Sequence, residues 1–388
     1  MTGALASRLG LVRMTGRDPG QHHRAASPLE LFFDLVFVVA VSQAAQNLHH
    51  GISEGHAGPA VLAYVMVFFA IWWAWMNFTW FASAFDTDDW LYRLSTIVQM
   101  GGVLVLAAGV HDAMSAGEWD TVTWGYVIMR LAMVGQWLRL AASDPEQRRT
   151  AIRYAIGIAA VQLLWVARIL FSADVQFWTF WPCLVLEVLV PIWAERARST
   201  PWHPHHIAER YSLFVLILLG ESLLASANAI IDALNSGEHL PGLIGLAVAG
   251  IALAAGIWWM YFSGEYGDRL RTMRQAFGFG YAHFILFAAV GAVSAGIEVE
   301  LDLLAGASEH LTAATASFAL TVPVAAFMLV VWALLLRRHI GAASSACFLV
   351  LTAAVLLSAL FPQGTVLGAT AAAVLAVVVV ELGRIRAR

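Results

Sequence analysis

The chain has 388 residues, of which 60% are hydrophobic and only 12% are charged, with a formal net charge of −4. A soluble protein of this size needs about a quarter of its residues charged to cover its surface. The composition therefore excludes an ordinary soluble protein and favours a polytopic membrane protein. We expect the lipid bilayer to be its main partner and expect no nucleic acid.

The polar, basic segment 1–26 lacks the apolar core and cleavage site of a signal peptide, so we predict a cytoplasmic tail. Apolar windows of about 20 residues follow, each long enough to cross a hydrocarbon core of about 30 Å. The first half is predicted to span the membrane at 31–50, 59–82, 93–111, 121–141, 151–171 and 176–194. The second half is predicted to span it at 207–231, 241–263, 277–297, 312–336, 340–360 and 365–384.

Basic residues are segregated along this pattern. The chain has no lysine, and with the N-terminus inside, every arginine except Arg130 and Arg168 falls in a predicted cytoplasmic segment or near the cytoplasmic end of a span. The outer loops, such as HDAMSAGEWDT and GIEVELDLLAGASEHLT, contain acids and no arginine. This asymmetry obeys the positive-inside rule and predicts twelve spans with both termini in the cytoplasm.

The two halves of the chain resemble one another. LELFFDLVFVVAVSQ in span one is echoed by AERYSLFVLILLGES in span seven, and WWAWMNFTWF in span two by WWMYFSGEYG in span eight. We therefore predict two six-helix repeats of the same orientation, 27–195 and 207–388, joined by a cytoplasmic linker at 196–206. Duplicated halves commonly enclose a central path at their interface. The alternative is that interfacial tryptophan pairs recur in any polytopic protein.

Three blocks, ELFFDLVFVVAVSQ, WWxW…TW…FDTDD and ERYSLFVLILLGESLL, resemble the bacterial low-temperature-requirement A proteins over about residues 27–384. The resemblance implies a multi-spanning inner-membrane protein, linked by name to growth in the cold, without a defined molecular activity. The positions that match its motifs are Glu30, Phe33, Asp34, Phe37, Trp73, Asp86, Asp88, Asp89, Glu209, Arg210 and Glu221.

FFDLVFVVAVS is also similar to the F-S-D-G-V-F-A-I-A-I-T opening of lysosomal-type potassium channels built from six-span repeats. In that family the first span of each repeat lines the pore. The present sequence departs at the second position and at the glycine, and has Ser212 where the second repeat would carry aspartate. The likeness therefore suggests an architecture only.

Glu30 and Asp34 lie four residues apart and share a helix face. Ser42, Gln46 and His49 continue a polar side along the same span. One interpretation is that this side lines a path, with Asp34 as its ionisable group. The alternative is that both acids cap the helix start, since Ser27 and Glu30 form a capping-box pattern.

Span seven carries the companion pattern. Glu209 stands near its inner end, and Glu221, Asn228 and Asp232 fall on one stripe. An uncompensated carboxylate at mid-membrane costs a few kcal/mol, so Glu221 should be protonated, paired or hydrated. We predict that at least one of the acids Asp34, Glu187 and Glu221 contacts Arg130 of span four, either in a path or as a structural ion pair. His283 in span nine is either a proton relay or a satisfied buried histidine.

The FDTDDW turn places Asp86, Asp88 and Asp89 together on the predicted cytoplasmic side. These carboxylates could hold a divalent cation, as in intramembrane prenyl-transferring enzymes. Alternatively, Asp88 or Asp89 is the N-cap of span three and pairs with Arg93. The WHPHHIAER histidines have metal-like spacing, but a solvated linker is favoured; we expect no metal and no cofactor.

These patterns leave three hypotheses for function. The first is a transporter or channel for an ion or small solute, using Asp34, Glu221 and Arg130. The second is an intramembrane enzyme that acts on a lipid or hydrophobic metabolite at the FDTDDW turn. The third is a membrane scaffold without turnover; a homodimer is left open.

Overall fold

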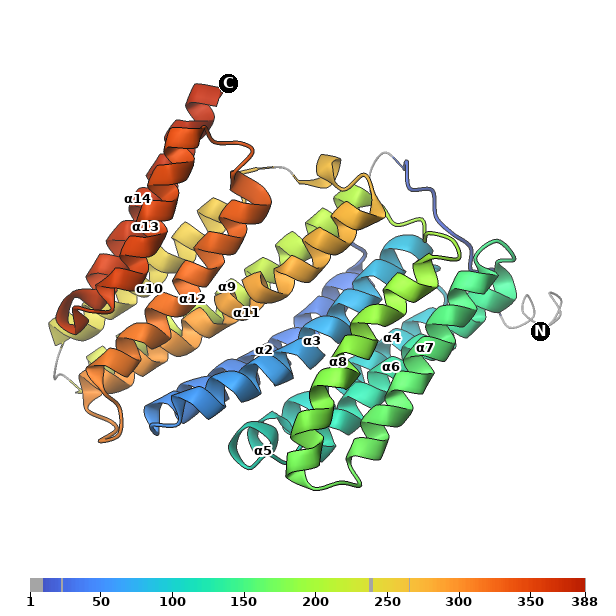
Figure 1. Ribbon diagram of the computed structural model, residues 1–388, viewed down its shortest axis with the longest axis horizontal. Coiled ribbons are helices and arrows are strands. Elements are labelled where there is room, and N and C mark those ends of the chain that lie inside the picture. Colours follow the sequence, from blue (N-terminus) through green and yellow to red (C-terminus); the bar gives the residue numbers. More distant parts are fainter. Residues whose placement is uncertain (1–9, 22–23, 237–239, 265, 388) are drawn as a thin grey trace. The chain divides into compact units, whose positions relative to one another are not determined.

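The structure is a computed structural model that describes residues 10–21, 24–236, 240–264 and 266–387. Side chains at 232–236, 269, 386 and 387 lie outside this description, including Asp232 of the predicted stripe. All regular elements in the described ranges are helices, which confirms the all-α prediction (Figure 1).

The helix bounds are as follows. Helices α2 to α8 are Pro28–Ser53, Ala57–Phe85, Trp90–Ala108, Val110–Ser115, Asp120–Ser143, Arg148–Arg168 and Ala173–Glu195. Helices α9 to α14 are Pro204–Ser236, Leu240–Tyr261, Met273–Ala305, Ala313–Val331, Ala342–Ser358 and Thr365–Ala387. Three short elements are the 3₁₀ helices η1 (Gly267–Arg269) and η3 (Pro362–Gly364) and the π-helix η2 (Trp332–Leu336).

Within the described residues, ten helices are long and apolar enough to cross a membrane. The other two predicted spans correspond to α6, which carries Arg130, and to α13. α13 has 17 residues, which rise about 26 Å, somewhat less than a hydrocarbon core of about 30 Å. The ten helices support a multi-pass membrane protein.

One predicted boundary is wrong. The acidic segment after residue 297 was expected to be an outer loop, whereas α11 continues to Ala305 and carries Glu298, Glu300 and Asp302 as helical residues. Its end is set by Gly306, which adopts the left-handed conformation (φ 63°) that terminates helices. The three acids therefore have the defined spacing of a helix.

The chain forms two compact units. Unit 1 comprises Met1–Ala40 and Phe69–Arg210, and unit 2 comprises Val41–Phe68 and Tyr211–Arg388. Helices α2, α3 and α9 contribute residues to both units, so the units do not coincide with the linear halves 27–195 and 207–388. The internal repeat stays a prediction.

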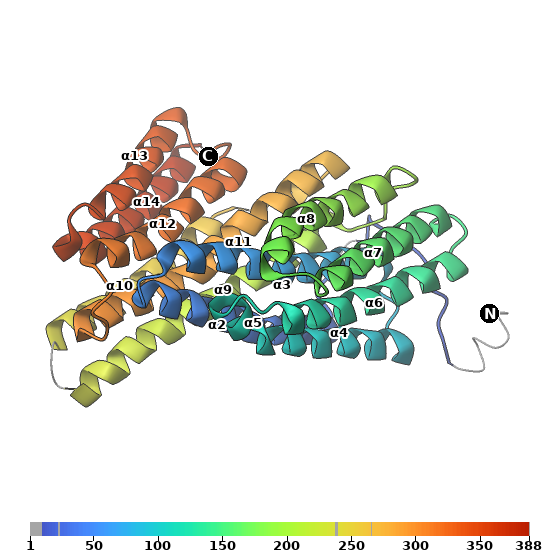
Figure 2. The same ribbon diagram turned by 60° about the horizontal axis from the view of Figure 1, so that its bottom comes forward.

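In unit 1, α6, α7 and α8 run side by side (Figures 1 and 2), and α4 packs against α6. The α4–α6 contact requires glycine, because a Cβ on Gly125 would lie 2.3 Å from the backbone nitrogen of Leu106. Trp137 of α6 stacks on Tyr154 of α7 with ring centroids 4.0 Å apart. Small residues and stacked rings thus bring these helices into close contact.

The described part of the predicted N-terminal tail is bound along unit 1. The backbone N–H of Val12 donates to Asp89, that of Gly16 to Asp144, and that of Arg17 to the carbonyl of Ala84, at 2.9, 3.2 and 2.9 Å. This segment is therefore part of the folded unit rather than a free tail.

In unit 2, α11 packs closely against α12, α13 against α14, and α10 against α14 (Figures 1 and 2). Gly296 of α11 allows the close approach, since its Cβ would lie 2.6 Å from the carbonyl oxygen of Ala319. α11 starts at a capping box formed by Thr272 and Gln275.

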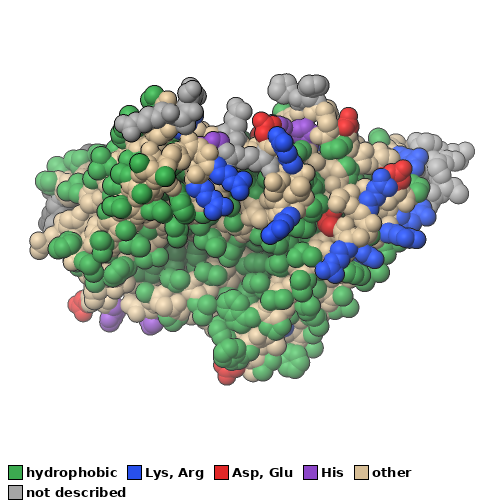
Figure 3. All heavy atoms as spheres, turned by 45° about the horizontal axis from the view of Figure 1, so that its top comes forward, with side chains coloured by type: hydrophobic (Ala, Val, Ile, Leu, Met, Phe, Trp, Pro, Cys, Tyr) green, Lys and Arg blue, Asp and Glu red, His purple; other side chains and the backbone are tan. Residues whose placement is uncertain are grey.

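Large apolar side chains cover much of the outer surface of both units. Leu163 of α7, Trp178 of α8, Val350 of α13 and Leu367 of α14 are each about 70% exposed. In Figure 3, hydrophobic side chains cover much of the face that is drawn, and basic side chains lie in groups among them. Such a surface is expected where lipid replaces water as the solvent.

Candidate functional site

The three carboxylates of the FDTDDW turn in unit 1 each bind an arginine. Asp86 lies 3.4 Å from Arg17, and Asp88 lies 2.8 Å from Arg93. Asp89 accepts a hydrogen bond of 2.9 Å from Nη1 of Arg139. The arginines come from the N-terminal segment, α4 and α6, so the turn joins three parts of the unit.

The predicted cap is confirmed, since Asp89 is the N-cap of α4 and accepts from the N–H of Tyr92 at 3.0 Å. Burial raises the pKa of Asp89, whereas hydrogen bonds from Arg139 and from two backbone N–H groups lower it. The lowering outweighs the effect of burial, so the pKa of Asp89 lies below its usual value. Burial raises the pKa of Asp86. Within the described ranges, no group of three or more His, Cys, Asp or Glu is placed to hold a metal ion.

A second cluster, the Arg210 cluster, joins α2, α3 and α9 in unit 1. Arg210 donates from Nη2 to Oδ1 of Asp34 at 2.6 Å, from Nε to Oδ2 at 3.0 Å, and from Nη1 to Glu30 at 2.8 Å. Trp75 adds an indole N–H to Asp34 at 2.7 Å. All four side chains are buried.

Glu30 has the capping role that the sequence predicts and a pairing role that it does not. The Ser27 N–H donates to its carboxylate at 2.8 Å, and the Glu30 N–H donates to the Ser27 hydroxyl at 3.3 Å. Its carboxylate also faces Nε2 of His206 at 3.2 Å. Arg24 lies 3.9 Å away and donates to the carbonyls of Ala82 and Ser83.

Arg210, which the sequence places at the predicted cytoplasmic end of span seven, is a buried residue. It lies inside α9 and is 0% exposed. A signal was available: His206 and Arg210 have the same four-residue spacing as Glu30 and Asp34, so each pair presents both its side chains on one helix face. Asp34 therefore belongs to a saturated ion pair.

A third cluster, the Glu187 cluster, lies at mid-helix in unit 1. The Glu187 carboxylate accepts from Arg130 (α6) at 2.8 Å and Gln162 (α7) at 2.8 Å. Indole N–H groups of Trp73 (α3) and Trp165 (α7) donate at 3.0 and 3.2 Å. The predicted contact between Arg130 and one of the three acids is confirmed, with Glu187 as the partner.

Four donors saturate Glu187, which is 0% exposed. Arg130 retains two buried nitrogens, Nε and Nη1, without a hydrogen-bond partner among the described residues. Removing either member would leave an uncompensated buried charge, which is strongly destabilising.

The polar side predicted for span one is found in unit 2, where it meets three carboxylates. His49 Nε2 lies 2.6 Å from Asp302 and its Nδ1 lies 3.3 Å from Glu298. The Ser53 hydroxyl donates to Asp302 at 2.6 Å. We call this group the unit 2 polar stripe; its members are Ser42, Gln46, His49 and Ser53 of α2, Glu221 of α9, and Glu298 and Asp302 of α11.

Glu221 joins the stripe at the end that contains Ser42. It is within hydrogen-bonding reach of the Ser42 hydroxyl and close enough to Glu298 for their charges to interact. Gln46 donates to Ser42 at 3.2 Å. Glu221 is 8% exposed, whereas the side chains of Glu298 and Asp302 are 18% and 24% exposed, so the stripe becomes more accessible along α2.

Other predicted residues lie apart from these clusters. His283 is fully buried in unit 2, with Nδ1 2.7 Å from the carbonyl of Phe279 and Nε2 3.1 Å from the Tyr261 hydroxyl, so both ring nitrogens are occupied. Asn228 is half-buried on α9. Glu209 is half-buried and its carboxylate lies 3.5 Å from the N–H of Ala26.

The predicted solvated histidine linker is wrong for two of its members. His203 and His206 are buried in unit 1, because His203 Nε2 lies 2.8 Å from the carbonyl of Gln21 and its Nδ1 accepts the N–H of His206 at 3.2 Å. His203 thus caps the start of α9.

Comparison with known proteins places this arrangement in a family. The model of the bacterial low temperature requirement A protein (LtrA) family matches residues 25–380. The chain belongs to the LtrA family. The match covers Asp34, Glu187 and Glu221, one acid from each of the Arg210 cluster, the Glu187 cluster and the unit 2 polar stripe.

Similarity to individual proteins adds no activity to this LtrA chain. It is 28% identical over 289 residues to an uncharacterized protein of Rhizobium meliloti (strain 1021), covering 69% of this chain and 68% of that protein. No solved structure gives a significant match.

Proposed function

We propose that this LtrA-family protein translocates a cation across the bacterial cytoplasmic (inner) membrane, and that the proton is the cation its chemistry fits best. In this proposal the chain crosses the membrane twelve times with both termini in the cytoplasm. The segregation of arginines along the sequence supports that orientation. The unit 2 polar stripe is the observation that carries the proposal.

The stripe has the length and composition of a partial membrane path. From Ser42 to Ser53 it follows α2 for about 16 Å, roughly half of a hydrocarbon core. Three carboxylates and one imidazole give it a negative balance, which attracts cations and repels anions. Hydroxyls, carboxylates and imidazole also exchange protons readily, and imidazole does so near neutral pH.

Unit 1 supplies a contrast that supports this assignment. Its buried acids Asp34 and Glu187 are bound by Arg210 and Arg130, and guanidinium groups do not release their protons in proteins. Such pairs hold helices together and cannot relay protons. Glu221, Glu298 and Asp302 have no arginine partner among the described side chains, and Glu298 and Asp302 face the imidazole of His49 instead.

The intramembrane-enzyme alternative has less support. It requires the FDTDDW carboxylates to bind a divalent cation, but Asp86, Asp88 and Asp89 each bind an arginine in unit 1. The scaffold alternative remains as one outcome of the experiment below.

The test is a flux assay on purified full-length protein in liposomes carrying a pH-sensitive dye. Wild type should dissipate a proton gradient faster than empty vesicles, and Glu221→Gln and Glu298→Gln should slow this by about tenfold or more, as expected when a proton-transfer group is lost. Glu146→Gln is the matched control, because that carboxylate is 71% exposed in unit 1. The control should retain the wild-type rate.

The same vesicles are then scanned for sodium and potassium flux. A rate equal to that of empty vesicles for all three cations would overturn the proposal and leave the scaffold. Equal rates for wild type and both glutamine variants would overturn the assignment to the polar stripe. Gel filtration and circular dichroism are used to check that each variant is folded.

A further inference from the structure

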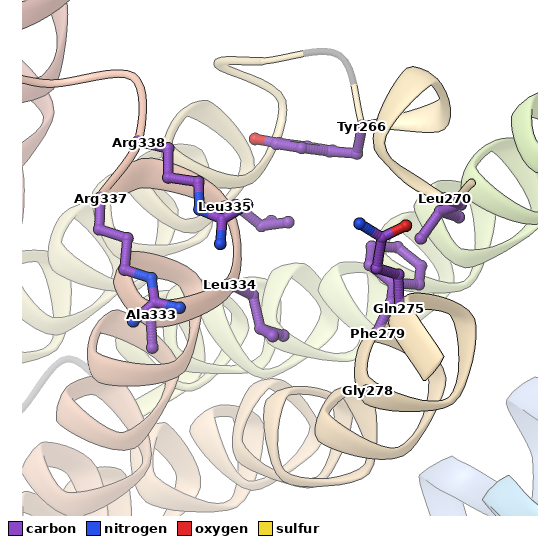
Figure 4. A pocket seen from close by; sticks show the side chains of 10 residues that line it. All are labelled: Tyr266, Leu270, Gln275, Gly278, Phe279, Ala333, Leu334, Leu335, Arg337 and Arg338. Atoms are coloured by element: carbon purple, nitrogen blue, oxygen red, sulfur yellow. The ribbon is translucent and has the colours of Figure 1, made fainter. Parts of the chain in front are cut away.

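A pocket of about 230 Å³ lies in unit 2 at the end of η2 and the start of α11. Its polar wall contains two consecutive arginines, Arg337 and Arg338, and the amide of Gln275 (Figure 4). Its apolar walls are Leu270, Phe279, Ala333, Leu334 and Leu335. In Figure 4 the Arg338 side chain lies across the pocket from Gln275, and Arg337 lies beside Ala333.

The two arginines carry charge that the described protein does not neutralise. Both are exposed, and neither guanidinium has a carboxylate or hydrogen-bond partner among the described residues. Most other arginines discussed above are bound: Arg17, Arg93, Arg130, Arg139 and Arg210 each pair with an acid. Two adjacent unpaired guanidinium groups attract a phosphate electrostatically and can bind it with parallel hydrogen bonds.

The backbone places both side chains at the pocket. The five residues Trp332–Leu336 form a π-helix, closed by the hydrogen bond from the Arg337 N–H to the carbonyl of Trp332 at 3.0 Å. This π-helix continues the end of α12, and π-helical turns are rare but frequent at functional sites.

The position and size of the pocket indicate the kind of ligand. It opens where two apolar helices long enough to span a membrane, Met273–Ala305 and Ala313–Leu336, have their ends. The ends of membrane-spanning helices generally lie near the headgroup level of a bilayer, where the lipid phosphates are. A volume of about 230 Å³ is below the roughly 300–1,000 Å³ of pockets that enclose whole drug-sized ligands, and leucine and phenylalanine walls suit the first carbons of acyl chains.

We propose that this pocket binds the headgroup phosphate of an anionic membrane phospholipid, with Arg337 and Arg338 as the phosphate ligands. The proposal is independent of cation translocation, since it uses neither the polar stripe nor its residues. Basic pockets between membrane helices on the cytoplasmic side are where such headgroups bind.

The test uses full-length protein in neutral detergent and measures retention of dioctanoyl phosphatidylglycerol by native mass spectrometry, with dioctanoyl phosphatidylcholine as the neutral comparison. The Arg337→Gln/Arg338→Gln variant should bind phosphatidylglycerol about tenfold more weakly or worse, because hydrogen bonds to charged groups are lost. The control Arg149→Gln/Arg196→Gln removes two exposed arginines of unit 1 and should bind like wild type.

A second variant closes the pocket while keeping both charges. Gly278 lines the pocket, and a Cβ there would meet no atom within 4 Å, so Gly278→Leu starts from an unstrained Cβ and adds apolar bulk at the pocket wall. It should also lose phosphatidylglycerol. Retention of lipid by both pocket variants would overturn the proposal, as would an equal loss in the control pair.

Competition with inorganic phosphate shows whether the pocket prefers the phosphate of a lipid headgroup or a free phosphate ion. At equal concentration it should compete poorly, because it cannot use the apolar walls. If inorganic phosphate binds as tightly as phosphatidylglycerol, the pocket is a site for a free anion and the lipid assignment is wrong.

Discussion

Arg210 of α9 holds Asp34 of α2 by two hydrogen bonds, 2.6 and 3.0 Å long, inside unit 1. Both side chains are shielded from solvent, so the loss of one partner leaves a buried charge uncompensated. We predict that Asp34→Asn lowers the free energy of unfolding by about 3–5 kcal/mol, measured in mild detergent titrated with sodium dodecyl sulfate.

A double-mutant cycle separates this pair from general damage. The variant Asp34→Asn/Arg210→Met should lose less stability than the sum of the two single variants, by about 1 kcal/mol or more. Additive losses would show that the two side chains are not coupled.

Glu187 is the acceptor for four donors from three helices of unit 1. Glu187→Gln should cost about 3–5 kcal/mol, because Arg130 then has no counter-charge. The emission of the tryptophans should shift, since Trp73 and Trp165 lose a charged acceptor. The exposed Glu146→Gln substitution should stay within about 0.5 kcal/mol of wild type; a comparable loss there would contradict the special role of Glu187.

The pH dependence of the free energy of unfolding should reveal the lowered pKa of Asp89. Its folded pKa lies below the usual value, and a carboxyl with a lowered folded pKa contributes stability that is complete above its unfolded pKa of about 3.9. That contribution is lost as the pH falls through the folded pKa. The stability difference between wild type and Asp89→Asn should therefore be constant near neutral pH and shrink in acid. A difference that grows in acid would contradict the sign of the shift.

Two glycines of α6 should respond in opposite ways to the same substitution. Gly125→Ala should destabilise unit 1 by about 1–3 kcal/mol, because its Cβ would collide with the α4 backbone. A Cβ on Gly135 would meet no atom within 4 Å, so Gly135→Ala should be neutral or stabilise by up to about 1 kcal/mol. Thermal unfolding of both variants decides this; equal effects would argue against the close α4–α6 contact.

The sequence predicts well the features that depend on residues close together in the chain. Helix positions followed from apolar windows, and the caps at Ser27–Glu30 and Asp89 followed from residue types at fixed spacing. The polar side of α2 at Ser42, Gln46 and His49 also followed from helical periodicity. Its acidic partners on α11 were missed, because a cluster of acids after an apolar run resembles an outer loop.

The sequence by itself determined the class of the protein, the approximate spans and the residues that are expensive to bury. Hydropathy, capping and helical spacing act over a few residues, so they are visible without a structure. Only the tertiary structure decided which charge meets which. Asp34 pairs with Arg210, which follows it by 176 residues, and Glu187 pairs with Arg130 on another helix. Those choices arise from helix packing, which brings distant residues together and has no local pattern in the chain.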